Sequence, residues 1–257
     1  MFWTAPEQME RHEKDLSKLL DTVQNLGGQF NIMENRVPVT QQLEYFEFAR
    51  RLQKKKRKMS DSDFNQYKEK LANDTPREEK KKVLILLALS SEIRAYRLLE
   101  KYVQEAEDDL VHWASMALME SRMWIESELT EKKQVYISTG LGGKGEKLRF
   151  YALILAMNGT PFEDYQRKII ETEVECVFSK NDCEIERLTI KNDYVEFVFL
   201  MPLSVDLRKI LQTLVMECNV YGNFLSPKFQ ATNVKEFNQD EVNQLLERNK
   251  KNRILNE

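Results

Sequence analysis

Residues 184–201 read EIERLTIKNDYVEFVFLM. Both halves of this stretch are rich in β-branched and aromatic residues, which favour strands. The three residues between the halves, Lys191-Asn192-Asp193, are typical of a tight hairpin turn. The stretch therefore predicts two antiparallel strands, over 184–190 and 194–201. It decides the fold class because a helix is predicted both before and after this hairpin.

The elements around the hairpin complete an α/β half of the chain. They are predicted as a strand over 149–157, a helix from about 161 to 177, a helix over 205–220, a strand near 227–234 and a charged helix over 239–249. From residue 149 the order is strand, helix, strand, strand, helix, strand. This order is typical of a ferredoxin-like fold, in which an antiparallel four-stranded sheet carries both helices on one face. An extra strand over 134–139 is expected to pair with the strand at 149–157.

The preceding half of the chain has helical periodicity. Helices are predicted over 6–25, from about 40 to the basic tract, from about 60 to 71, over 76–89, over 92–105 and from 108 to about 129. The second is expected to bury Leu43, Phe46 and Phe48, and the last to place Trp113 and Trp124 in the core. The predicted class is therefore α+β, with a helical domain over 1–130 and a ferredoxin-like domain over 131–257.

Two segments of the helical half share a motif. Glu92-Ile93-Arg94 is followed by Leu98-Leu99, and Asp109-Leu110-Val111-His112 is followed by Ala114, Ala117 and Leu118. The pattern resembles the second helix of HEAT-type repeats, and the resemblance covers residues 77–129. It departs from the family where His112 replaces an arginine. The resemblance implies a short solenoid with a protein-docking surface, while a generic helical bundle is the alternative.

Composition excludes several classes of protein. An apolar share of 42% predicts a sizeable core, and a net charge of −3 argues against a polycation. The three cysteines, Cys176, Cys183 and Cys218, lack the spacing of a zinc or redox motif, and two histidines leave little for a metal site. We expect reduced thiols, a cytoplasmic location, no metal and no cofactor. The most apolar run, Val83 to Leu89, is too short to span a membrane.

A basic tract stands out against this balanced charge. It contains seven Lys or Arg in nine residues, namely Arg50, Arg51, Lys54, Lys55, Lys56, Arg57 and Lys58. Residues 50–82 hold thirteen basic and six acidic side chains, a net +7, so the remaining chain carries −10. Three interpretations stay open: a solvated helix face or a dock for the protein's own acidic surface, a nucleic-acid footprint, and a site for an acidic protein partner.

A glycine-rich loop is the second candidate site. It contains Gly140, Gly142, Gly143, Lys144 and Gly145. Four glycines beside a lysine suggest a phosphate cradle. However, Lys144 is followed by Gly145 and Glu146 and then by a predicted strand, whereas a Walker loop needs Ser or Thr and a helix. A hairpin tip and a flexible contact loop for a partner are therefore the alternatives to a nucleotide site.

The predicted sheet is a poor match to an RNA-recognition surface. Val195, Phe197 and Phe199 share one face of their strand, and Tyr194 and Glu196 share the other. If the apolar three face the core, the open face presents one tyrosine beside a carboxylate that repels phosphates. Stacking of RNA bases on this sheet is therefore disfavoured.

No catalytic constellation is visible in the sequence. The paired carboxylates Asp108-Asp109 and Glu78-Glu79 begin helices, where they favour the helix dipole. The sequence thus predicts a non-enzymatic cytosolic adaptor with a protein partner and a capacity to form homo-oligomers. The first alternative is an RNA- or ribosome-associated factor that uses the tract 50–58. The second is an enzyme acting on an anionic ligand near Lys144.

Overall fold

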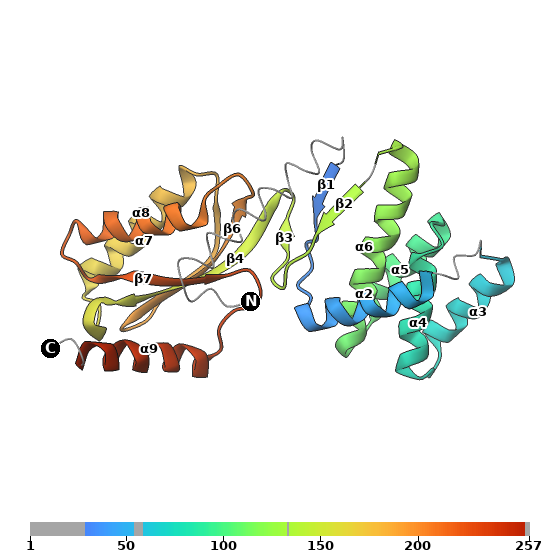
Figure 1. Ribbon diagram of the computed structural model, residues 1–257, viewed down its shortest axis with the longest axis horizontal. Helices are drawn as coiled ribbons and strands as arrows, with labels where there is room; N and C mark the ends of the chain where they lie inside the picture. The colour runs from blue at the N-terminus through green and yellow to red at the C-terminus, as the bar shows by residue number, and fades with distance from the viewer. Residues whose placement is uncertain (1–28, 54–58, 133, 255–257) are drawn as a thin grey trace. The chain divides into compact units, whose positions relative to one another are not determined.

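The computed structural model describes residues 29–53, 59–132 and 134–254 (Figure 1). The helix predicted over 6–25 and the basic residues at 54–58 lie outside these ranges. The described chain divides into two compact units, residues 29–142 and residues 143 onward. We call them the helical unit and the α/β unit. The predicted domains, with their boundary at residue 130, stay a prediction.

The helical unit contains five helices among its described residues and a small parallel sheet. Its elements are β1 (Gln29–Ile32), α2 (Val39–Gln53), α3 (Asp61–Ala72), α4 (Arg77–Ala88), α5 (Ile93–Glu105), α6 (Asp108–Thr130) and β2 (Gln134–Ile137). The long helix α6 packs against α2, α4 and α5 (Figure 1). Buried aliphatic side chains of α4, such as Leu84, Ile85 and Leu87, are fully enclosed and form the middle of this core.

Helix α2 corrects one prediction about the core. Leu43 and Phe46 were expected to face inward, but their side chains are 64% and 48% exposed. The buried positions are instead Gln42, Tyr45 and Ala49, which lie three and four residues apart and so share one side of the helix. The inward side is fixed by polar contacts of Gln42 and Tyr45 rather than by the most apolar side chains.

The pairing of the predicted strand at 134–139 was also wrong. It forms β2, which pairs in parallel with β1, with Gln29 opposite Gln134 and Ile32 opposite Ile137. The expected partner strand at 149–157 lies in the other unit and pairs with β3, β6 and β7. The error arose because β1 is only four residues long and lies about a hundred residues from its partner, so that no local pattern reveals it.

The α/β unit is built on an antiparallel sheet. Its elements are β3 (Gly143–Lys144), β4 (Lys147–Ala156), the 3₁₀ turn η1 (Met157–Gly159), α7 (Asp164–Ser179), β5 (Glu184–Ile190), β6 (Tyr194–Pro202), α8 (Leu207–Asn219), β7 (Leu225–Thr232) and α9 (Gln239–Ile254). Strand β4 pairs with β6, which pairs with β5, and the other side of β4 pairs with β3 and then β7. The predicted α+β class, with an antiparallel sheet, is confirmed.

Both faces of this sheet are covered. Helices α7 and α8 lie on one face and α9 on the other (Figure 1). On the α7 side, the ring of Phe178 lies 5.5 Å from that of Phe197 and 4.8 Å from that of Phe199. On the α9 side, Tyr151 is fully buried and its ring lies 5.1 Å from Phe237. The sheet is therefore a two-sided core rather than an open platform.

Candidate functional site

The basic tract begins on the last turn of α2. The structure places Arg50 and Arg51 there, both exposed to solvent. Cations at this end of a helix are favoured by its dipole. Arg51 forms an ion pair with Glu47 one turn earlier, whereas Arg50 has no ion pair among the described residues. The remaining tract residues, Lys54 to Lys58, lie outside the described part of the chain.

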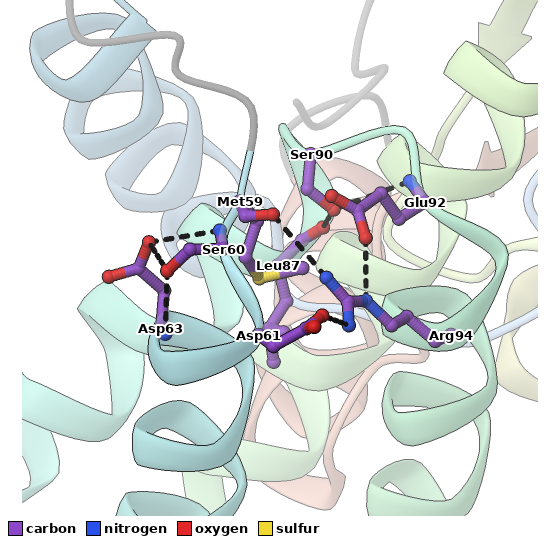
Figure 2. Close-up of polar contacts among 8 residues, drawn as sticks. All are labelled: Met59, Ser60, Asp61, Asp63, Leu87, Ser90, Glu92 and Arg94. Carbon is purple, nitrogen blue, oxygen red and sulfur yellow. Dashed lines mark hydrogen bonds and ion pairs between the residues drawn. The ribbon is translucent and has the colours of Figure 1, made fainter.

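The chain leaves the tract at a firmly held position. Met59 is buried, and its backbone carbonyl accepts a hydrogen bond from Arg94 on α5 (Figure 2). Ser60 then caps α3 by accepting a hydrogen bond from the backbone N–H of Asp63, whose carboxylate accepts one from the backbone N–H of Ser60. Met59, the residue after the tract, and the start of α3 are thereby fixed to the body of the unit.

Arg94 joins three segments of the helical unit. Its guanidinium donates to Asp61 Oδ1 at 2.5 Å and to Glu92 Oε2 at 2.6 Å (Figure 2). It also lies 4.9 Å from the centre of the Phe64 ring. The hydrogen bond to Asp61 is the largest cause of a raised pKa for Arg94. These contacts engage the carboxylates of Asp61 and Glu92 with Arg94.

Three of the nearby lysines, Lys70, Lys81 and Lys82, form ion pairs. Lys70 and Lys82 share the carboxylate of Glu79, at 3.2 Å and 3.8 Å, and the hydrogen bond from Lys70 lowers the pKa of that carboxyl. Lys81 lies 3.3 Å from Glu78 and 4.8 Å from the centre of the Trp113 ring. Part of the positive charge of α4 is therefore offset by its own carboxylates and by the face of the Trp113 ring.

The glycine loop divides into a packed part and an exposed part. Gly140, Gly142 and Gly143 are buried, while Lys144 and Gly145 are exposed. The N–H of Gly142 is donated to the carbonyl of Thr139, and Lys144 lies in β3 opposite Lys147. The N–H of Gly142 is therefore already used within the loop and is not directed toward an anion. A role for Lys144 in contacting a partner stays a prediction.

The sheet of the α/β unit offers no aromatic platform on its described faces. The Tyr151 hydroxyl donates a 2.8 Å hydrogen bond to Glu196, and Tyr194 is buried beside them. Phe197 and Phe199 face the helices, as described above. Stacking of bases on this sheet would require removal of the segment around Phe237 and α9.

The thiols and histidine of the described residues do not form a reactive centre. Cys183 and Cys218 are buried, and burial raises the pKa of Cys183 to about 11 and that of Cys218 to about 12. His112 Nδ1 lies 2.9 Å from the amide oxygen of Gln41. Within the described ranges, no three His, Cys, Asp or Glu side chains gather as metal ligands. None of the helices described has the length and apolarity needed to cross a bilayer.

Sequence reasoning missed one surface feature beside the tract. Phe46 was assigned to the core because its spacing from Leu43 fits an apolar stripe, yet both side chains point outward on the face that carries Arg50. Gln42 and Tyr45 could have revealed this orientation. Both carry polar groups that can form hydrogen bonds when buried, so their side of the helix could also face inward.

Comparison with known proteins gives limited matches. The sequence matches no protein-family model and no curated relative. A solved protein of Deinococcus radiodurans R1 assigned as a transposase is 16% identical, with a TM-score of 0.35, and the match covers 40% of this chain and 91% of that one. A REP-associated tyrosine transposase bound to a REP hairpin is 11% identical, with a TM-score of 0.31, and the match covers 39% of this chain and 62% of that chain.

These neighbours correct the function expected from the sequence. Both are transposases, which are enzymes, and this finding contradicts the expectation of a non-enzymatic adaptor. It also contradicts the description of the chain as a HEAT-like repeat protein for protein docking. The local resemblance of residues 77–129 stays a prediction. At TM-scores below 0.5 neither neighbour indicates what this chain binds. A binding function is therefore inferred from the residues of this chain alone.

Proposed function

We propose that the helical unit binds the phosphate backbone of nucleic acid through the basic tract, residues 50–58. One observation carries this proposal: seven of nine consecutive residues are basic, and the two at the start of the tract, Arg50 and Arg51, are exposed on the last turn of α2. Cations that replace condensed counterions along a chain of phosphates bind it without regard to sequence.

The distribution of ion pairs supports this choice of surface. Lys70, Lys81 and Lys82 are each within ion-pair distance of a glutamate on α4, so their charge is partly cancelled. Arg50 has no such partner among the described residues, and Arg51 has only the exposed Glu47. Exposed ion pairs contribute little and exchange readily for phosphate contacts. Arg50 and Arg51 are therefore available to a polyanion at the end of α2.

The buried residues on either side of the basic tract also favour binding. Tyr45 and Ala49 bury the inner side of α2 just before the tract, and Met59 is buried just after it. Because both flanks are held by the fold, less conformational entropy is lost on binding than for a free basic tail.

Salt dependence is the test of this proposal. Binding of labelled single- and double-stranded DNA and RNA would be measured by fluorescence anisotropy between about 50 and 200 mM salt. We expect the logarithm of affinity to fall with the logarithm of salt, by roughly 0.7 to 0.9 per phosphate contact. Replacing Lys54, Lys55, Lys56 and Arg57 together by glutamine should flatten that slope. An Arg50→Gln, Arg51→Gln variant should reduce it by a smaller amount.

A matched control distinguishes binding at the basic tract from non-specific binding by other exposed cations. The exposed lysines Lys168, Lys191, Lys209 and Lys228 of the α/β unit can be replaced by glutamine, which removes the same number of positive charges. We expect the slope of this control to stay near that of the wild type. Equal slopes for the tract variant and the control, or wild-type binding that does not depend on salt, would overturn the proposal.

We further propose that the α/β unit has a ferredoxin-like topology. Its support is the strand order β7, β4, β6, β5, all antiparallel, with α7 and α8 on one face. The additional strand β3 extends the same edge of β4 that β7 occupies. A solution structure of residues 143–257 that kept this strand order would test the proposal.

A further inference from the structure

The outward face of α2 combines apolar and charged side chains. The exposed Glu47, which forms an ion pair with Arg51, lies beside Phe46 and Arg50. Leu43, Phe46 and Arg50 follow one another at spacings of three and four residues, so they lie along one side of the helix. Leu43 is 64% exposed and Phe46 is 48% exposed, and Arg50 is exposed as well. This row leads directly into the basic tract.

The orientation of α2 keeps these apolar side chains in water. The buried amide of Gln42 donates hydrogen bonds to the carbonyls of Val37 at 2.8 Å and Thr139 at 3.1 Å, and its oxygen accepts one from Ser138. Rotating the helix to bury Leu43 and Phe46 would break these bonds and expose Tyr45. Because unpaired buried polar groups are costly, the helix keeps its register and the aromatic ring stays outside.

The ring of Phe46 is held in place by its neighbours. It meets the ring of Tyr45 edge to face, with 5.9 Å between centroids. Tyr45 is itself fully buried, bonded to Glu120, and its ring lies 5.4 Å from that of Trp113. Because the Phe46 ring already packs against Tyr45, it loses little conformational freedom when a base stacks on it.

We infer that this face of α2 binds single-stranded nucleic acid, with a base stacked on Phe46 and an adjacent phosphate contacted by Arg50. The inference rests on the proposed function and names its substrate class. We infer a polyanionic ligand because the row Leu43, Phe46 and Arg50 leads into the basic tract, which has a large excess of positive charge. Within a duplex the bases are stacked on one another, whereas a single strand offers its ring faces to an aromatic side chain.

Substitution at Phe46 tests the stacking. Probes would be labelled oligonucleotides of about 20 thymidines or uridines, longer than the roughly 4–16 nucleotides that comparable sites cover. Phe46→Ala should weaken single-strand binding by roughly 5- to 150-fold, since stacking of one base contributes about 1–3 kcal/mol. Duplex binding and the salt slope should stay unchanged, because no charge is removed. Phe46→Trp should retain affinity, and Phe46→Leu should lose it.

Controls and outcomes distinguish this inference from the proposed function. Leu129→Ala and Tyr221→Ala remove large side chains that are 77% and 56% exposed elsewhere, and neither should affect binding. If Phe46→Ala and Phe46→Leu bind single strands as the wild type does while the tract variant flattens the salt slope, stacking is overturned and backbone binding stands. If the loss is equal for single strands and duplexes, stacking is likewise overturned. Wild-type binding without salt dependence would overturn both.

Discussion

The hydroxyl of Tyr45 on α2 donates a 2.6 Å hydrogen bond to Oε2 of Glu120 on α6. Both side chains are buried, and no ion pair to this carboxylate is found among the described residues. Burial raises the pKa of Glu120, while the hydrogen bond from Tyr45 acts in the opposite direction. Burial also raises the pKa of Tyr45. Folding therefore favours the neutral form of both groups.

The first prediction concerns the pH dependence of stability at Glu120. Because the carboxyl has a higher pKa in the folded chain, the folded state binds more protons, and this group lowers stability as pH rises above its usual value of 4.5. Glu120→Gln cannot ionise. We expect the wild type to lose stability relative to this variant as the pH rises above 4.5. Urea denaturation at a series of pH values would measure the difference.

Tyr45→Phe supplies the control for that experiment. It removes the donor and leaves the buried carboxylate less satisfied, which should cost about 1–3 kcal/mol at neutral pH. In the Glu120→Gln background the cost should be smaller, because a neutral amide needs the hydroxyl less. A wild-type to Glu120→Gln difference that stays constant with pH would contradict a raised pKa at this site.

The second prediction concerns the two tryptophans of α6. Trp113 is 2% exposed, and its ring lies 5.4 Å from Tyr45 and 5.8 Å from Phe48. Trp113→Ala should cost about 3–5 kcal/mol of stability, as deletion of a large buried ring does. Trp124 is only partly buried, so Trp124→Ala should cost less. Equal shifts of the two denaturation midpoints would show that the core is not centred on Trp113.

The strands of the α/β unit could be predicted because their signals are local. Strand β5 covers the predicted residues, and β6 begins at the predicted Tyr194, since the hairpin turn and the β-branched residues lie within one short stretch. The same holds for β4 and α8, which differ from the prediction by only a few residues at their ends. Local periodicity was enough wherever each element packs through its own apolar face.

In the helical unit, local patterns of apolar residues did not predict which side of α2 is buried. The buried position of Gln42 depends on carbonyls at Val37 and Thr139, and the latter lies 97 residues away. A pattern of apolar residues alone assigns Leu43 and Phe46 to the core instead. The cations of the tract were evident in the sequence, but the exposed ring beside them required the register of α2. Long-range polar contacts decided that register, and no window of sequence contains them.

The third prediction compares two glycines of the loop at 140–145. Both have positive φ, +68° at Gly142 and +59° at Gly145. A Cβ at Gly142 would lie 2.4 Å from the carbonyl oxygen of Glu34 and 2.8 Å from that of Asn35, whereas nothing lies within 4 Å at Gly145. Gly145→Ala should cost only the backbone strain of about 1–2 kcal/mol. Gly142→Ala should cost clearly more, and equal melting temperatures would contradict the close approach.

The last prediction concerns Arg94, which joins the end of the basic tract to α5. Its guanidinium group donates hydrogen bonds to Asp61, Glu92 and the Met59 carbonyl at the same time. A lysine ammonium group cannot reproduce this planar arrangement of donors. Because the side chain is partly exposed, global stability should change little in Arg94→Lys. Hydrogen exchange should instead become faster at the first amides of α3, while α6 stays protected. Arg97→Lys is a suitable control, since Arg97 pairs only with Glu100 on its own helix among the described residues. Unchanged exchange at α3 in Arg94→Lys, or an equal effect in Arg97→Lys, would show that Arg94 does not anchor the start of α3.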